Sequence, residues 1–551
     1  MFLSLNMNLY MNRLSNIAFR IFTILSLSLQ VVSAVAQENR MGISGYAQLN
    51  SISSHGDYAP YWLTAKNQGL SSVEKSNGYA RVGVLLDGKF GEKSNWKYSV
   101  VADAVTAYNQ TDVVALQQLN ADFSWKWLRL SVGSKERFAE MKNFCVLNDS
   151  SSFVNNSLNK LFPNLYYNKY QELSSGGLVY SGNSRPIPQL RVEIPEYVEF
   201  PWTNGWMQIK AHLAYGYFAD GGFQEDFTAS NEKARYGKNI FYHSKSLFIK
   251  VGKKEKFPLT FEGGLEMHTQ FGGNVYTRSD GKVVSMPAGV KDFFKAFIPM
   301  GGDENTPEYE QTNISGNFIG SWHAAFTYHT KPVDVRLYAE HMFEDFSQLF
   351  FMEYQSDASG DRNLIYYPWR DILVGISLTN KSSFMPFVSN VLYEYVSTYD
   401  QSGAGYNDPG PFFKEQMDGA DNYFNHSIYP GWHYQGMGIG TPLAVSPVYN
   451  TNGSLRFASN RFVAHNVGVN GTLGRVLPLA YRLQYTYSEN WGTYLNPFRE
   501  KKYTTSLLCD IIYAPTASKW AGTISLGYDK SNFIGENLGV MFTITRLAVF
   551  K

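Results

Sequence analysis

The sequence has little cysteine and little charge, and each shortage excludes a class of protein. Cysteine occurs only at Cys145 and Cys509, which is too few for a disulfide framework and too sparse for a metal-ligand pattern. We expect two buried thiols, with a single disulfide as the alternative. Charged residues make up 17% of the chain, against about 25% in an ordinary soluble domain. The formal net charge is +1, so the overall charge gives no reason to expect nucleic acid or an acidic partner.

Long hydrophobic runs are also missing, apart from one at the N-terminus. Arg13 and Arg20 precede an apolar stretch at 21–32, which is followed by Ala34-Val35-Ala36. Basic residues, a short apolar run and an A-x-A site are typical of a secretory signal peptide, which we predict at 1–36. The alternative, a membrane anchor helix, needs about 20 apolar residues. No later stretch is long enough to predict a membrane-spanning helix.

Familiar catalytic motifs are absent as well. H-E-x-x-H, C-x-x-C and G-x-S-x-G do not occur. GVLLDGKF at 83–90 matches a phosphate-binding loop except that Phe90 replaces the Ser or Thr that would bind magnesium. Glu340, Glu344 and Asp345 could pair as carboxylates for sugar hydrolysis, but we favour a polar lumen and a charged rim. We therefore expect no enzymatic activity, no metal and no cofactor, and we assign no catalytic residue.

Aromatic residues are abundant instead, at 16% of the chain. Many lie in segments where apolar and polar residues alternate, such as WMQIKAHLAYGY at 206–217 and LAYRLQYTYS at 479–488. A two-residue repeat predicts β-strands, although a soluble antiparallel sandwich would show the same alternation. Two features favour a membrane barrel. The apolar faces end in Tyr and Trp, as expected at the headgroup level of a bilayer, and the segments exceed the usual strand length of about 5–6 residues.

The lengths of the connections between these segments support a barrel. We predict roughly eighteen strands, near 40–51, 78–89, 94–106, 118–133, 173–180, 187–194, 206–217, 243–252, 257–269, 316–329, 332–343, 369–379, 386–399, 462–474, 477–490, 502–514, 518–529 and 534–550. Connections after even-numbered strands are mostly short, and those after odd-numbered strands are often long. This sorting is typical of an outer-membrane barrel with both termini in the periplasm.

The expected fold class is therefore all-β: an antiparallel outer-membrane β-barrel of about 18 strands over residues 37–551, with a lumen occluded by loops. One long connection after an even-numbered strand, at 134–172, breaks the pattern. A short helical insert on the periplasmic side would explain this exception, and so would a misassigned strand.

One long connection concentrates rings without a regular period. It spans 400–461 and contains GADNYFNHSIYPGWHYQGMGIGTPLA at 419–444; by strand parity it lies outside the cell. Aromatic rings can stack on the C–H face of a sugar, while Asn, Asp and His side chains bind its hydroxyl groups. We predict that the polysaccharide-binding residues are Asp421, Asn422, Tyr423, His426, Tyr429, Trp432, His433 and Tyr434. In the alternative, the loop folds into the lumen and its rings pack there as a plug.

Seven blocks of sequence carry a resemblance to a known family. They are SSGGLVYSGNSRPIPQLRVEIPEYVEFP (174–201), GWMQIKAHLAYGYFAD (205–220), FEGGLEMHTQFGG (261–273), GNFIGSWHAAFTYH (316–329), YAEHMFEDFSQ (338–348), LYEYVSTYDQSG (392–403) and DNYFNHSIYPGWHYQGMGIGTPLA (421–444). In this order they resemble the Wzi family of capsule assembly proteins, in the form seen in Bacteroides-like bacteria. The resemblance implies an eighteen-stranded outer-membrane barrel, occluded by its loops, that acts as a lectin and holds capsular polysaccharide at the cell surface.

Three classes of function therefore compete. A lectin-like protein in the cell outer membrane, with capsular polysaccharide, outer-membrane lipid and the capsule export machinery as partners, is the one we favour. A porin or substrate-specific diffusion channel is the alternative, because eighteen strands enclose a wide lumen unless it is filled. An outer-membrane enzyme comes third, with Glu344 and Asp345 as its candidates.

Overall fold

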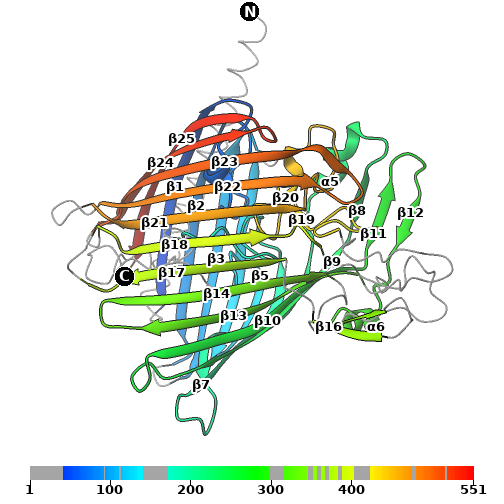
Figure 1. Ribbon diagram of the computed structural model, residues 1–551. Helices are drawn as coiled ribbons and strands as arrows, with labels where there is room; N and C mark the ends of the chain where they lie inside the picture. Colours follow the sequence, from blue (N-terminus) through cyan, green and yellow to red (C-terminus); the bar gives the residue numbers. More distant parts are fainter. Residues whose placement is uncertain are drawn as a thin grey trace, which may run out of the picture.

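The computed structural model describes most of the chain beyond its N-terminal segment (Figure 1). The described residues are 41–91, 94–110, 113–140, 172–297, 316–344, 352–356, 362–366, 371–382, 387–401, 422–473, 479–515 and 518–550. The predicted signal peptide, Cys145, Asp345 and Asp421 lie outside them. No helix among the described residues has the length and apolar character needed to cross a membrane.

The main body is a closed antiparallel β-barrel of 18 strands. Its strands are β1 (Gly42–His55), β2 (Ser76–Lys89), β3 (Trp96–Tyr108), β4 (Val114–Trp125), β5 (Leu128–Ser134), β6 (Gln189–Glu199), β7 (Met207–Tyr217), β9 (Phe241–Val251), β10 (Leu259–Phe271), β13 (Asn317–His329), β14 (Val333–Glu344), β17 (Ile372–Asn380), β18 (Asn390–Ser397), β21 (Phe462–Thr472), β22 (Leu479–Gly492), β23 (Pro497–Tyr513), β24 (Trp520–Ser531) and β25 (Glu536–Phe550). Each pairs with the next along the chain, and β1 pairs with β25 to close the barrel. The predicted fold class is confirmed.

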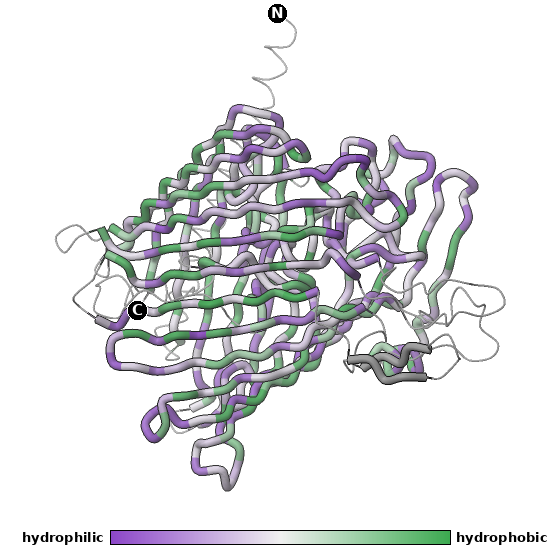
Figure 2. The backbone as a smooth tube through the Cα atoms, in the orientation of Figure 1, coloured by the Kyte–Doolittle hydropathy of each residue, from purple (hydrophilic) through white to green (hydrophobic). Residues whose placement is uncertain are grey.

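The wall of the barrel is apolar outside and polar inside, which is the reverse of a soluble protein. On β24, Leu526 points outward and is 53% exposed, whereas its neighbour Ser525 points inward and is 0% exposed. Figure 2 shows this alternation of hydropathy along the strands, with hydrophilic residues gathered at the turns. An apolar outer band is the surface that a barrel presents to lipid. Cys509 is a free, half-buried thiol on this wall rather than the buried one predicted.

Two of the predicted strands are wrong, and the two errors cancel in the count. The segment 118–133 is not one strand but the hairpin of β4 and β5, whose two-residue turn places Lys126 at φ 51°. Such turns usually carry Asn or Gly, and Lys126 and Trp127 are neither, so the turn could not be recognised from its residues. The segment 173–180 is not a strand; its apolar residues Leu178 and Val179 are buried inside the barrel.

The corrected strand order explains the connection that broke the predicted pattern. Residues 135–188 join β5 to β6, which are the fifth and sixth strands of the barrel. Counted by position in the barrel, this connection therefore follows an odd-numbered strand. This connection therefore leaves from the same rim as the other long ones, 56–75, 218–240, 272–316, 345–371 and 398–461. We call this rim the long-connection rim and the opposite one the short-turn rim. The connection that broke the predicted alternation of short and long connections therefore results from a wrongly predicted strand. The predicted helical insert falls largely in 141–171, outside the described residues.

Candidate functional site

Three long connections fold back into the lumen and pack against one another. We call their described parts, 56–75, 172–188 and 422–461, the plug. The amide of Thr441 donates to the carbonyl of Leu178 at 3.0 Å, and the amide of Gln68 donates to the carbonyl of Gly182 at 2.9 Å. Aromatic and aliphatic side chains from all three segments share one buried core with inward-facing wall residues. The plug and the barrel wall are thus a single packed unit.

One buried carboxyl group on the wall holds the plug by several hydrogen bonds. Glu394 points inward from β18 and is 0% exposed. It accepts hydrogen bonds from the hydroxyl of Ser174 at 2.7 Å and from the amide of Ser175 at 2.6 Å, both in the plug. It also accepts from Tyr338 at 2.6 Å and Asn466 at 3.1 Å, both on the wall. Buried polar groups need such partners, so Glu394 fixes the plug at a defined position.

The carboxylates considered for sugar hydrolysis have a similar structural surrounding. Glu340 is buried on β14 and accepts the amide of Leu178 in the plug at 2.8 Å. Glu344, on the same strand, is also buried. A glycosidase needs two carboxyl groups on either side of an accessible sugar. Because plug backbone covers Glu340, the described geometry favours a structural role for it.

Two facing glycines on the wall provide the seat for helix α2 (Tyr61–Thr64) of the plug. Gly527 on β24 pairs in register with Gly539 on β25. A Cβ atom built on Gly527 would lie 2.6 Å from the Cβ of Pro60 and 2.9 Å from Cγ of Leu63, and one on Gly539 would lie 2.8 Å from Cδ of Pro60. These are distances that real Cβ atoms do not show. The absence of side chains at these positions therefore lets the plug reach the wall.

We expect Gly527→Val to displace α2 and to destabilise the protein by about 1–3 kcal/mol, the usual cost of overpacking a filled core. The matched control is Gly522→Val on the same strand, where the nearest atom of a non-adjacent residue to an added Cβ is the carbonyl oxygen of Thr543, at 3.8 Å. Urea unfolding in lipid vesicles and limited proteolysis of the plug would measure both effects. Equal behaviour of the two variants would contradict the assigned seat.

The ring-rich loop lies in the plug rather than on the surface. Tyr423, Tyr429 and Trp432 are buried, as are His426, His433 and Tyr434, while Asn422 is partly buried. The indole of Trp432 donates to the carbonyl of Val179 at 3.0 Å, and the hydroxyl of Tyr429 donates to the carbonyl of Gly272 at 3.0 Å. Those predicted binding residues that the structure describes therefore lie together inside the lumen. This is the arrangement that the sequence analysis gave as the alternative to an exposed loop. A sugar could stack on the rings only if the loop moved.

The two histidines of this loop are neutral at pH 7. Burial lowers the pKa of His426 to about 3 and that of His433 to about 4. Nδ1 of His426 accepts the amide of Ile428 at 3.0 Å, which requires an unprotonated nitrogen. Neither side chain can therefore attract an acidic sugar by charge.

One of the predicted residues, although only 6% exposed, lines a small hollow at the long-connection rim. Tyr434, on the short strand β19 (His433–Tyr434), lines a hollow of about 50 Å³. Ser71, Gln110, Arg185 and Gln435 also line it. These residues come from four connections of the same rim, so the hollow lies where the plug meets the other connections of that rim.

A small sheet beyond this rim carries an aromatic pair that the sequence did not predict. Strands β8 (Arg235–Lys238), β11 (Asn274–Thr277) and β12 (Val283–Ser285) form it, and Figure 1 shows it projecting beyond the barrel. Tyr236 and Tyr276 face each other in register and stack with ring centroids 5.1 Å apart and an interplanar angle of 11°. Nζ of Lys238 lies 5.5 Å and 5.7 Å from the two ring centroids. Half-buried rings beside polar groups form a surface suited to sugars.

No group of three or more His, Cys, Asp or Glu side chains in the described parts of the chain is placed to hold a metal ion. The described geometry thus offers a polar and aromatic rim above a filled lumen. These features define the class: a closed outer-membrane-type barrel, plugged by its own connections.

The fold is similar to that of known outer-membrane barrels. No family model and no curated protein matches the chain. Among solved structures it is similar to Wzi of Escherichia coli, described as an outer-membrane protein involved in group 1 capsule assembly and a carbohydrate-binding β-barrel; the identity is 10%, the match covers 91% of this chain and 83% of that one, and the TM-score is 0.48. It is also similar to OccK5 (OpdH) of Pseudomonas aeruginosa; the identity is 8%, the match covers 93% of this chain and 98% of that one, and the TM-score is 0.43. A third similar structure is OccAB4 of Acinetobacter baumannii, with 8% identity, coverage of 92% of this chain and 98% of that one, and a TM-score of 0.42. Likeness at this level carries no argument about function.

Proposed function

We propose that this protein resides in the cell outer membrane, binds exported capsular polysaccharide at the long-connection rim and anchors it to the cell surface. The apolar outer band supports the location, because lipid is the surrounding in which exposed residues such as Leu526 are stable. The proposal places the long-connection rim outside the cell, as long loops are in barrels of this type. It includes the capsule export machinery as a partner that delivers the polysaccharide.

The filled lumen is the observation that carries this proposal. A diffusion channel needs an open path, and eighteen strands would enclose one if nothing filled it. Here the plug is hydrogen-bonded to Glu394 and Glu340 and is seated on Gly527. The alternative function, a diffusion channel, therefore requires the plug to move. Binding at the rim requires no such movement.

The glycan-binding surface in this proposal is formed by the Tyr236–Tyr276 pair and the hollow beside Tyr434. The pair offers two half-buried rings on the small sheet, and the hollow adds amide, hydroxyl and guanidinium groups. The other predicted residues that the structure describes shape the plug under this surface. Direct contact of Asn422, Asp421 or the buried rings with glycan stays a prediction.

We expect Tyr236→Ala combined with Tyr276→Ala to weaken glycan binding by at least about tenfold, or about 1.4 kcal/mol, because tyrosine rings commonly supply much of the binding energy of an interface. Capsule retention on cells should fall in parallel. Tyr487→Ala with Tyr503→Ala, a stacked pair on the barrel wall, is the matched control. A glycan array probed with detergent-solubilised protein would supply the ligand and measure the effect.

Three outcomes would overturn this proposal or part of it. Steady porin-like conductance of the natural protein in planar bilayers would favour the channel. Shortening of a glycan by the pure protein, abolished by Glu344→Gln, would assign it to the enzymes. If Trp432→Ala with Tyr429→Ala leaves both capsule retention and glycan binding unchanged, the predicted role of the ring-rich loop is wrong. Such a result would exclude direct contact of these rings with glycan and also an indirect role in positioning the rim residues.

A further inference from the structure

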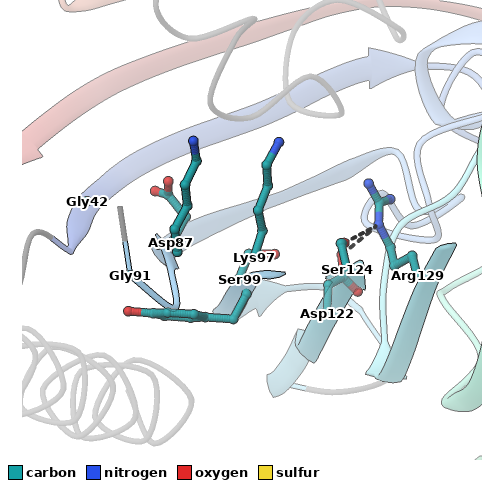
Figure 3. A pocket seen from close by; sticks show the side chains of 11 residues that line it. Gly42, Asp87, Gly91, Lys97, Ser99, Asp122, Ser124 and Arg129 are labelled. Carbon is teal, nitrogen blue, oxygen red and sulfur yellow. Dashed lines mark hydrogen bonds and ion pairs between the residues drawn. The ribbon is translucent and has the colours of Figure 1, made fainter. Parts of the chain in front are cut away.

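A second and larger cavity lies at the opposite end of the lumen, at the short-turn rim. Its volume is about 960 Å³, and it is lined by the ends of strands β1 to β5. Figure 3 shows the cavity with Lys97 and Arg129 extending to the same side. We call it the vestibule. The charged side chains that line it are Asp87, Lys89, Lys97, Asp122 and Arg129.

Two lysines of the vestibule face each other directly across the sheet. Lys89 on β2 and Lys97 on β3 are register partners. Both share the inward side of their strands with the buried pair Arg81 and Asp103, which lie an even number of residues away. Like charges directly opposite in a β-ladder repel each other. Neither lysine forms an ion pair with a described residue, so none of the described carboxylates offsets this repulsion directly.

The acidic groups that line the vestibule are Asp87 and Asp122. Asp87 lies on the same inward side of β2 as Lys89, two residues away, and its carboxyl group leans toward β1: a Cβ at Gly42 would be 2.8 Å from its Oδ1. Asp122 forms an ion pair with Lys135 and lies 4.0 Å from Nε of Arg129. Neither carboxylate forms an ion pair with Lys89 or Lys97, and the cavity is lined by three basic side chains, Lys89, Lys97 and Arg129, against these two acidic ones, which leaves an excess of positive charge.

From this arrangement we propose that the vestibule binds an anionic saccharide, one that carries a carboxylate or a phosphate. Lysine ammonium groups act as point charges that attract either anion, and a bound anion would remove the repulsion between Lys89 and Lys97. The hydroxyls of Ser99 and Ser124 and the side chain of Arg129 line the same cavity, where they can bind sugar hydroxyls. A cavity of about 960 Å³ is far larger than a simple ion needs.

The vestibule lies on the rim opposite to the proposed polysaccharide surface, so this inference goes beyond the proposed function. It assigns to the protein a second contact, on the side of the membrane where its short turns lie. Two sources of the ligand share the required chemistry: the acidic end of a glycan chain and the phosphorylated sugar of a lipid headgroup. The probes below distinguish them.

The test is calorimetric titration of the full-length protein in detergent, at low and at high salt. The probes are a tetrasaccharide of alternating glucuronic acid and N-acetylglucosamine, its carboxyl-reduced neutral form, glucosamine 6-phosphate and inorganic phosphate. We expect one of the two anionic sugars to bind, the neutral form not to bind, and affinity to fall as salt rises. Binding of the tetrasaccharide alone identifies a carboxylated ligand, and binding of glucosamine 6-phosphate alone identifies a phosphorylated one.

Lys89→Gln combined with Lys97→Gln should reduce the affinity by about tenfold or more, because the charge-assisted contacts are lost. Lys126→Gln with Lys256→Gln is the matched control, since it removes the same charge from exposed turns of the same rim. Equal loss in both double variants, no binding of either sugar, or equal binding of inorganic phosphate would overturn the proposal. The Tyr236 and Tyr276 variants should leave this titration unchanged, so failure here and failure of the proposed surface function are separable.

Discussion

Replacing Glu394 by alanine is expected to release the plug from the barrel wall and to open the lumen. The substitution removes the acceptor of four hydrogen bonds, those from Ser174, Ser175, Tyr338 and Asn466. Each buried donor left without a partner costs about 1–3 kcal/mol, so the plugged state should lose about 4 kcal/mol or more. The plug donors regain partners if the segment leaves the wall and meets water. Opening therefore relieves much of this cost.

The barrel itself should survive this change, because its interstrand hydrogen bonds do not involve the Glu394 side chain. Single-channel recording in planar bilayers should show rare opening of the natural protein and frequent opening of Glu394→Ala. Glu394→Gln keeps one acceptor oxygen and should lie between the two. Glu489→Ala, which removes a more exposed acid paired with Lys501 at 3.0 Å, is the control. A Glu394→Ala protein that stays closed and resists proteolysis would show that this carboxyl group does not hold the plug.

The barrel was predictable because lipid outside and a polar lumen inside impose a two-residue period on every strand. That period was visible in β22 and β24, and the sorting of connection lengths gave the topology. The period could not separate β4 from β5, because their turn at Lys126 and Trp127 carries no turn residue. It also misled at 173–180, where Leu178 and Val179 are apolar because they face the plug core, not lipid.

The site was less predictable, because a high density of rings is the same signal for an exposed platform and for a buried plug. Long-range contacts such as those of Trp432 with the carbonyl of Val179 and of Tyr429 with the carbonyl of Gly272 decide its place, and they join connections far apart in the chain. The Tyr236–Tyr276 stack depends on the register of β8 against β11, which short strands do not reveal. Glu340 was noticed as an acid, but its role as an acceptor for the plug needed the fold.

Leu483→Arg is expected to cost about 2–4 kcal/mol of barrel stability, the range for a cation placed on the lipid face near mid-membrane. Leu483 is 43% exposed on the outer side of β22. It lies in an apolar belt with Val467, Leu507 and Leu526 from the neighbouring strands. Arginine there must either lose its hydration or draw water into the lipid, and either costs free energy. Urea unfolding in lipid vesicles, followed by tryptophan fluorescence, measures the loss.

Leu495→Arg is the matched control because it places the same substitution in the turn of the same hairpin. Leu495 is 74% exposed between β22 and β23, and an arginine there stays in water or at the headgroups. If lipid covers the outer face, the losses of unfolding free energy in the two variants should differ by most of the cost at Leu483. Detergent micelles deform around a charge more readily than a bilayer does. In micelles, the difference between the two losses should therefore be smaller. Equal costs in vesicles would mean that the outer band of this barrel does not face hydrocarbon, and the membrane assignment would fail with it.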